Sequence, residues 1–137
     1  MAADARTLAR IHRVRTLQLT LARAEESRAR DAVATETAMS ARIAQLAEAV
    51  APVSGGAVTL GAAAHYRERL NSSALAAAAR VRAAEADAGR AAQGARGARQ
   101  DQSAVEKLIE RAGRDTVRRE MRELEQVGLG RKRHGPC

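Results

Sequence analysis

One stretch of the sequence, residues 81–124, limits what this chain can fold into more than any other. Within it, mostly small or apolar residues recur at steps of three and four: Val81, Ala84, Ala88, Ala91, Ala95, Ala98, Gln102, Val105, Ile109, Ala112 and Thr116. A run of about five heptads with this spacing is typical of a coiled-coil seam and predicts one long helix. Because most of the seam is alanine, a neighbouring helix can approach closely, but each contact buries little apolar area. The helix therefore needs a partner helix.

The residues before this stretch predict a first helix of comparable character. Neither Gly nor Pro interrupts residues 8–50, and Asp4 and Thr7 are suitable N-caps. We expect its buried stripe to include the succession 24–28–32–36, a stutter that loosens the supercoil. The predicted stripe is Val14, Leu17, Leu21, Ala24, Arg28, Ala32, Glu36, Met39, Ile43, Leu46 and Val50.

Pro52, Gly55 and Gly56 predict a turn between the two helices. The second helix is expected to begin near Thr59, with a seam that runs through Tyr66, Leu70, Ala74 and Ala77 into the ladder above. The predicted fold is all-α, a single antiparallel coiled-coil hairpin over residues 1–127 whose second helix is longer and overhangs the first. Its expected parts are helix 1 at about 5–50, a turn at 51–58 and helix 2 at about 60–127, before a disordered basic tail at 128–137.

Three glycines fall inside the second helix, at positions 89, 94 and 97. Each lowers helix stability by about 1 kcal/mol relative to alanine. We interpret them as points of close backbone packing against the first helix, with a functional hinge as the alternative.

Composition argues against a compact globular core. The chain has no Phe or Trp and a single Tyr, and its formal net charge is +8, carried almost wholly by arginine. A basic chain without a core could also be disordered, but the regular ladder favours helices over that alternative. The excess positive charge predicts an acidic partner such as a protein surface, a nucleic acid or an anionic lipid.

An antiparallel fold about residues 52–58 would place Ala5 near Val105 and leave residues beyond about 107 without a partner in the chain. It would also gather the two arginine-rich ends of the chain at one pole, where we predict a partner-binding site. The predicted site residues are Arg6, Arg10, Arg13, Arg15, Arg111, Arg114, Arg118, Arg119, Arg122, Val117, Met121 and Leu124. Some of these arginines have carboxylates four residues away and are expected to pair on the helix surface: Glu110 with Arg114, Asp115 with Arg119, and Arg119 with Glu123.

The sequence offers no pattern for catalysis. The three histidines share no helical face, the glycine pairs are not followed by Lys-Ser or Lys-Thr, and the single Cys is the final residue. We therefore expect no enzyme activity, no cofactor, no metal site and no small-molecule substrate. The alternative function is non-specific nucleic-acid binding by a basic coiled coil, although the sequence has no aromatic set for stacking bases. A peripheral membrane helix would need a Trp- or Phe-bearing face, which this sequence lacks. We also expect no membrane-spanning helix, because no apolar run of about 18 residues occurs, and no secretory signal.

Three stretches of the sequence resemble the flagellar FliJ family, small basic helical hairpins of the bacterial type III export apparatus. They are residues 17–25, residues 65–70 after the Gly-containing connector, and residues 104–111 followed by a charged helix to Gln126. Family members tend to close with an acidic helical segment, whereas this chain ends with the basic residues 131–133.

The resemblance implies a stalk-like coiled coil that engages the hexameric export ATPase, the export gate and, as further partners, export chaperones. It implies a cytoplasmic protein, peripheral at the inner face of the inner membrane at the flagellar base through its partners alone.

Overall fold

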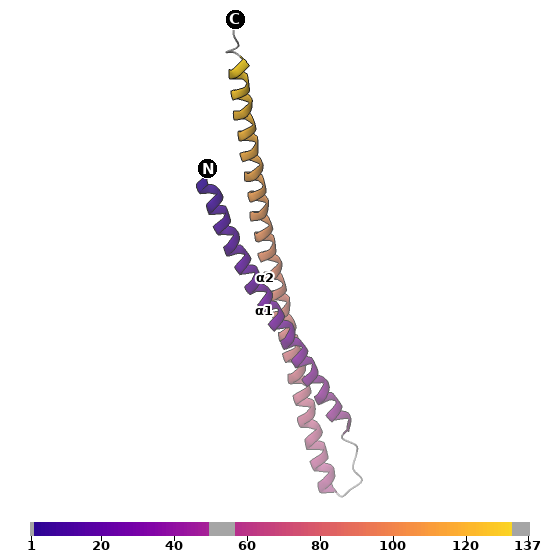
Figure 1. The fold of residues 1–137 in the computed structure, drawn as a ribbon. Coiled ribbons are helices and arrows are strands. Elements are labelled where there is room, and N and C mark those ends of the chain that lie inside the picture. Colours follow the sequence, from indigo (N-terminus) through magenta and orange to yellow (C-terminus); the bar gives the residue numbers. More distant parts are fainter. Residues whose placement is uncertain (1, 50–56, 133–137) are drawn as a thin grey trace. The chain divides into compact units, whose positions relative to one another are not determined.

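The fold is an all-α hairpin of two helices that pack against each other, as predicted (Figure 1). The computed structural model describes residues 2–49 and 57–132. Helix α1 spans Ala2–Ala49 and the longer α2 spans Ala57–Lys132, and these ranges contain no strand. In each packed region the helices run in opposite directions, since residue numbers rise along α1 as they fall along the facing part of α2.

Helix α2 extends further toward the C-terminus than predicted. It continues through Gly128 to Lys132, so residues 128–132 are helical rather than part of a disordered tail. The expected stop required a left-handed glycine after the last turn, but no described glycine has a positive φ. At the other end α2 begins at Ala57, two residues before the predicted cap Thr59. Most of the predicted turn and the last five residues of the predicted tail lie outside the described residues.

The helices form two packed units, and each is described by itself. In the terminal unit, residues 2–20 of α1 pack with residues 97–132 of α2. In the middle unit, residues 21–49 of α1 pack with residues 57–96 of α2.

The seam of α2 follows the predicted ladder closely. Its members from Leu70 to Val105 are all at least partly covered, and Ala77, Ala84, Ala95, Gln102 and Val105 are buried. Three predicted members toward the ends are exceptions, because Tyr66, Ile109 and Thr116 are exposed. Alanine at most of these positions lets the α1 backbone approach α2 closely.

The predicted seam of α1 is wrong over most of its length. The exposed fractions of Leu17 and Leu21 are both 64%, whereas Leu19 is buried with 4% exposed. The side chains that are at least partly covered follow an unbroken heptad pattern together with Thr16: Leu8, His12, Arg15, Leu19, Ala22, Glu26, Ala29, Val33, Glu36, Ser40, Ile43 and Ala47. Among the described residues, only Glu36 and Ile43 belong to both the predicted and the observed stripe, and the predicted member Val50 lies outside that range.

Continuity of spacing explains why this face packs although it is less apolar. Alternating steps of three and four keep a stripe toward the partner helix, whereas the predicted stripe contains four-residue steps that rotate it away. Polar members of the observed stripe also meet complementary groups on α2, as Glu36 does with Arg80 at 3.2 Å. The predicted stutter is therefore absent from the packed face of α1.

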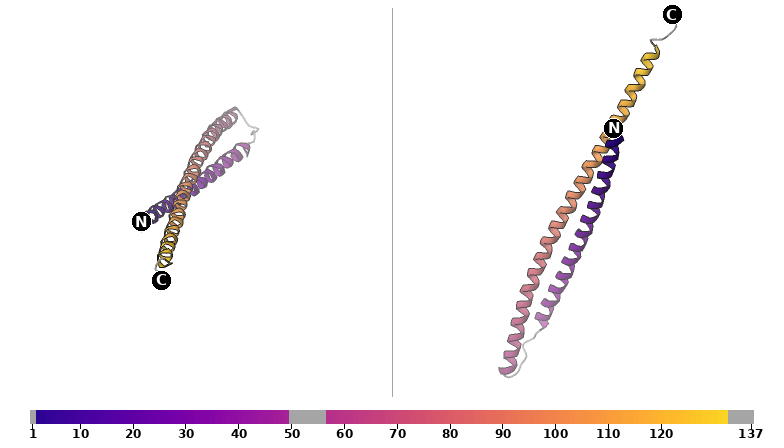
Figure 2. Two further views of the ribbon diagram at one scale, coloured as in Figure 1. Left: turned by 90° about the horizontal axis from the view of Figure 1, so that it is seen from above. Right: turned by 90° about the vertical axis from the view of Figure 1, so that its left-hand side faces the viewer.

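The register of the hairpin also differs from the prediction. In the terminal unit, His12 lies beside Glu106, so Ala5, seven residues earlier, lies beside Gly113 rather than Val105. Residues beyond about 116, rather than 107, therefore extend past the start of α1, and Figures 1 and 2 show α2 continuing there. The shift is eight residues, about one heptad, which presents nearly the same faces to each other, so apolar spacing alone distinguishes the two registers poorly.

The same reasoning explains the exposed start of α2 in the middle unit. Glu36 lies beside Arg80, so Ala49, thirteen residues later, lies beside Arg67. Tyr66 and Leu60 then extend beyond the end of α1, and their exposed fractions are 50% and 53%.

The glycines of α2 do not mark close backbone packing. A Cβ atom added at Gly89, Gly94 or Gly97 would meet no atom within 4 Å. Their φ angles are not positive, so an alanine would be accommodated without strain. The close-packing interpretation is therefore wrong for all three residues.

The corrected α1 seam predicts opposite outcomes for two neighbouring leucines. Leu19→Ala should lower the free energy of unfolding by about 2 kcal/mol or more, because it removes a buried side chain. Leu17→Ala should change it by less than about 0.5 kcal/mol, because Leu17 lies on the exposed face. Urea titrations followed by circular dichroism would measure both, and an equal loss in the two variants would contradict the assignment.

The open space around the glycines predicts that alanine stabilises α2. Gly89→Ala and Gly94→Ala should each raise the free energy of unfolding by about 1 kcal/mol, because alanine has the higher helix propensity. Thermal melts of the two single variants and the double variant would test this. A lower melting temperature in either single variant would show that the glycine has a packing or hinge role that the structure does not reveal.

Candidate functional site

The structure brings all of the predicted partner-binding residues into the terminal unit. Four of the predicted arginines lie on α1 within residues 2–20, and the other eight site residues lie on α2 within residues 97–132. The prediction that the two ends of the chain meet at one pole agrees with this unit. The residues differ, however, in what surrounds them.

A network of polar side chains joins the two helices of this unit. The Gln102 Nε2 donates to Thr16 Oγ1 at 3.1 Å, and Thr16 Oγ1 donates to the His12 carbonyl at 2.8 Å. Gln102 Oε1 accepts a hydrogen bond from Arg99, so both ends of this buried amide are satisfied. One turn away, His12 Nε2 lies 3.4 Å from Glu106 Oε1. A satisfied network of this kind specifies one register along an otherwise uniform alanine seam.

Arg15 belongs to this internal network rather than to a free basic surface. Its Nη1 lies 3.2 Å from the Asp101 carboxylate and 3.1 Å from Gln18 Oε1. The side chain is partly covered and occupies a seam position. Of the predicted site residues, Arg15 is the one that the structure assigns to the intrachain interface.

The other arginines of α1 form a locally uncompensated positive surface. Arg6, Arg10 and Arg13 are exposed, and none forms an ion pair with a described residue. No acidic residue occurs between positions 5 and 20. This start of α1 is therefore a basic surface without an acidic residue in its own stretch of sequence.

The end of α2 mixes acidic with basic side chains instead. Between residues 107 and 125 five acidic side chains alternate with six basic ones, and Arg131 and Lys132 raise the net charge of residues 107–132 to +3. Arg111, Arg114, Arg118, Arg119 and Arg122 are all exposed. None of the three predicted ion pairs four residues apart lies within ion-pair distance, in keeping with the small energy of such pairs at an exposed surface.

The end of α2 also presents an apolar surface, which we call the C-terminal stripe: Val117, Met121, Leu124 and Gly128. The exposed fractions of its three large side chains are 58%, 56% and 69%. Every described residue from Gly113 to Gly130 is exposed, so α1 covers none of this stripe. The prediction that these apolar side chains lack a partner within the described chain agrees with their exposure.

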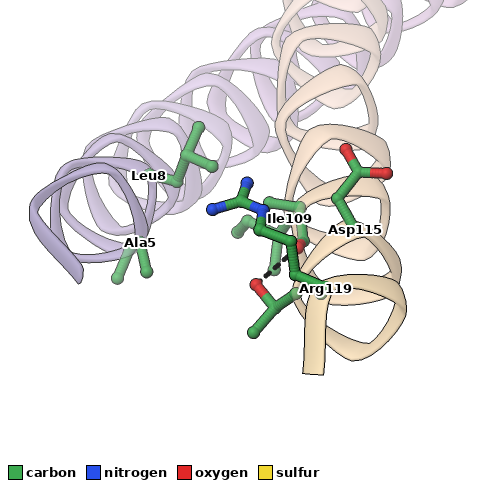
Figure 3. A pocket seen from close by; sticks show the side chains of 9 residues that line it. Ala5, Leu8, Ile109, Asp115 and Arg119 are labelled. Atoms are coloured by element: carbon green, nitrogen blue, oxygen red, sulfur yellow. Dashed lines mark hydrogen bonds between the residues drawn. The ribbon is translucent and has the colours of Figure 1, made fainter. Parts of the chain in front are cut away.

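Sequence reasoning missed a groove between the two helices of the terminal unit. It has a volume of about 330 Å³ and is lined by Ala5, Leu8, Ala9, Ile109, Ala112, Gly113, Asp115, Thr116 and Arg119. Figure 3 shows the Arg119 side chain extending from α2 toward α1, while Asp115 lies on the far side of α2. The small residues on both helices were the sequence signal for this groove, because their side chains leave space between the helices.

Sequence reasoning also missed an exposed apolar face on α1, because Val14 and Leu17 had been assigned to the seam. Ile11, Val14 and Leu17 are exposed by 39%, 52% and 64%. Ile11 and Val14 line a shallow groove with Arg10, Arg15 and Gln18. The arginines of α1 therefore flank apolar side chains, as those of α2 do.

The described residues offer no other kind of site. Within residues 2–49 and 57–132 there is no group of three His, Cys, Asp or Glu side chains that could hold a metal ion. None of the described helices is long and apolar enough to cross a membrane.

Comparison with known proteins adds no assignment to these surfaces. No protein-family model matches the chain, and neither a curated protein nor a solved structure matches it. The likeness to the flagellar FliJ family therefore rests on the sequence patterns alone.

Proposed function

We propose that the chain is a non-enzymatic component of the bacterial flagellar type III export apparatus, a stalk-like coiled coil that engages the export ATPase ring. The observation that carries the proposal is the end of α2, which extends past the start of α1 with exposed apolar and arginine side chains. A helix that enters a ring of subunits needs such a surface on all sides, because each subunit grips a different face. The resemblance supplies the identity of the ring, and the export gate and export chaperones follow as further partners.

The same proposal places the protein in the cytoplasm, at the inner face of the inner membrane through its partners. The exposed arginines of α1 lie in the same unit as the α2 end and would meet acidic groups of the ring. Charge complementarity of this kind raises the rate of association and sets orientation, while the apolar stripe supplies most of the binding free energy.

Reversal of three arginines at the end of α2 tests the proposal. The variant Arg114→Glu/Arg118→Glu/Arg122→Glu should lose binding to the export ATPase and any stimulation of its hydrolysis, because acidic groups on the ring would then be repelled. Helix content should stay near that of the wild type, since all three side chains are exposed and outside the seam. ATPase activity and circular dichroism would be measured on the same samples.

A matched control carries the same change in net charge in the other unit. Arg67→Glu/Arg69→Glu/Arg82→Glu also alters three exposed arginines, and it should leave the ATPase contact intact. Full stimulation by the first variant, or an equal loss in both, would show that the end of α2 is not the contact.

Non-specific nucleic-acid binding is the second candidate, and the unpaired arginines Arg6, Arg10 and Arg13 favour it. Binding of a DNA duplex, measured by fluorescence anisotropy, should fall by more than tenfold between about 50 and 200 mM salt, because the release of counterions from the DNA gains less entropy as the salt concentration rises. Replacing the three arginines with glutamine should flatten this dependence. Nanomolar, sequence-selective binding at physiological salt would instead make nucleic acid the principal partner.

A further inference from the structure

The C-terminal stripe begins where the intrachain seam ends. Continued at heptad spacing beyond Thr116, the seam of α2 would pass through Arg119, Glu123 and Gln126, which are polar. The apolar residues lie instead one or two positions after these seam positions, at Val117, Met121 and Leu124. This change of face coincides with the point at which α2 passes the start of α1 in the terminal unit. The new stripe is therefore patterned for a helix other than α1.

We propose that a second copy of this chain covers the C-terminal stripe by antiparallel pairing of the two α2 ends. Steps of four, three and four from Val117 to Gly128 place these residues at alternating core positions of a coiled coil. In the antiparallel register, Met121 of one copy meets Leu124 of the other, and Val117 meets Gly128. Each contact occurs twice because the pairing is symmetric.

Charge complementarity selects this arrangement. Arg118 directly follows Val117, and Glu125 directly follows Leu124. Both side chains therefore flank the same side of the proposed apolar core. Antiparallel pairing sets Arg118 of each copy against Glu125 of the other, which gives two attractive pairs. Parallel pairing would instead set Glu120 against Glu125 and would place Arg114 against itself in the core, and both contacts are repulsive.

The same pattern limits the length of the interface. One layer further out, Arg114 would face Arg131 of the other copy, so the apolar pairing stops at Val117 and Gly128. Four apolar layers make a small interface, which is typical of weak and reversible association. We expect a monomer at low concentration and a dimer at concentrations on the order of hundreds of micromolar.

This inference concerns the chain alone and does not rest on the proposed function. If the chain also binds a ring ATPase through the end of α2, self-association covers the same stripe and competes with that contact. The two can be tested separately, because one is measured on the isolated chain and the other requires the ATPase.

Sedimentation equilibrium of the full chain over a range of concentrations, in low salt with a reducing agent, would test the pairing. Reduction excludes a disulfide through Cys137, and low salt limits screening of the ion pairs. The wild type should show a monomer–dimer equilibrium. Arg118→Glu alone and Glu125→Arg alone should each weaken the dimer at least tenfold, because each sets like charges against each other.

Two combinations should restore association. The double variant Arg118→Glu/Glu125→Arg again pairs opposite charges, and an equimolar mixture of the two single variants should form a mixed dimer for the same reason. Arg122→Glu, which changes the net charge as Arg118→Glu does but lies outside the paired side, is the control and should leave the equilibrium unchanged.

A wild type that stays monomeric at the highest concentration would overturn the proposal and leave the stripe to another protein. A double variant that remains monomeric, or an Arg122→Glu variant as weak as Arg118→Glu, would also overturn it. Circular dichroism on each sample checks that helix content is retained, and the mixture of single variants tests the pairing even if the double variant folds poorly.

Discussion

The narrow, alanine-rich seam of α2 is the constraint on which the rest of the structure depends. Alanine lets α1 approach closely, but it gives little apolar burial and almost no information about register. Buried or partly buried polar side chains supply that information. Three polar contacts between the helices form in the observed register. They join Gln102 to Thr16 and His12 to Glu106 in the terminal unit, and Glu36 to Arg80 in the middle unit.

A consequence of this polar seam is that large apolar side chains are left on the outside. Helix α1 packs through His12, Thr16 and Leu19 and leaves Val14 and Leu17 exposed. Helix α2 leaves Val117, Met121 and Leu124 exposed beyond the start of α1. A chain that buries few of its leucines, valines and methionines within its own fold has apolar surface for binding other helices. This exposed surface supports both the proposed function and the proposed self-association.

Positive charge is distributed unevenly over the terminal unit. At the start of α1, Arg6, Arg10 and Arg13 form no ion pair with a described residue, whereas acidic and basic side chains alternate along residues 107–125 of α2. The first can attract acidic partners over a distance, and the second can distinguish one alignment of helices from another. These are separate contributions to binding. Net charge affects the rate at which the partners associate, and alternating charge affects the register in which the helices align.

The sequence by itself determined that the chain is helical, that two helices form a hairpin and that α2 packs through the ladder from Leu70 to Val105. These features follow from periodicity, which is a local property of the chain. It also determined that the two ends of the chain would meet, since a single turn separates two long helices. The predicted arginines and Val117, Met121 and Leu124 lie in one unit, and their role in binding a partner stays a prediction.

Only the tertiary structure decided which face of α1 packs and in which register. The leucines at positions 17 and 21 are a stronger apolar signal than His12, Arg15 and Thr16, so single-helix reasoning chose the wrong face. The correct face depends on groups of α2 such as Gln102 and Asp101, far away in sequence. A shift of eight residues, about one heptad, likewise changes little of the local pattern, so the position at which α2 leaves α1 is fixed by pairwise contacts that become visible once both helices are in place.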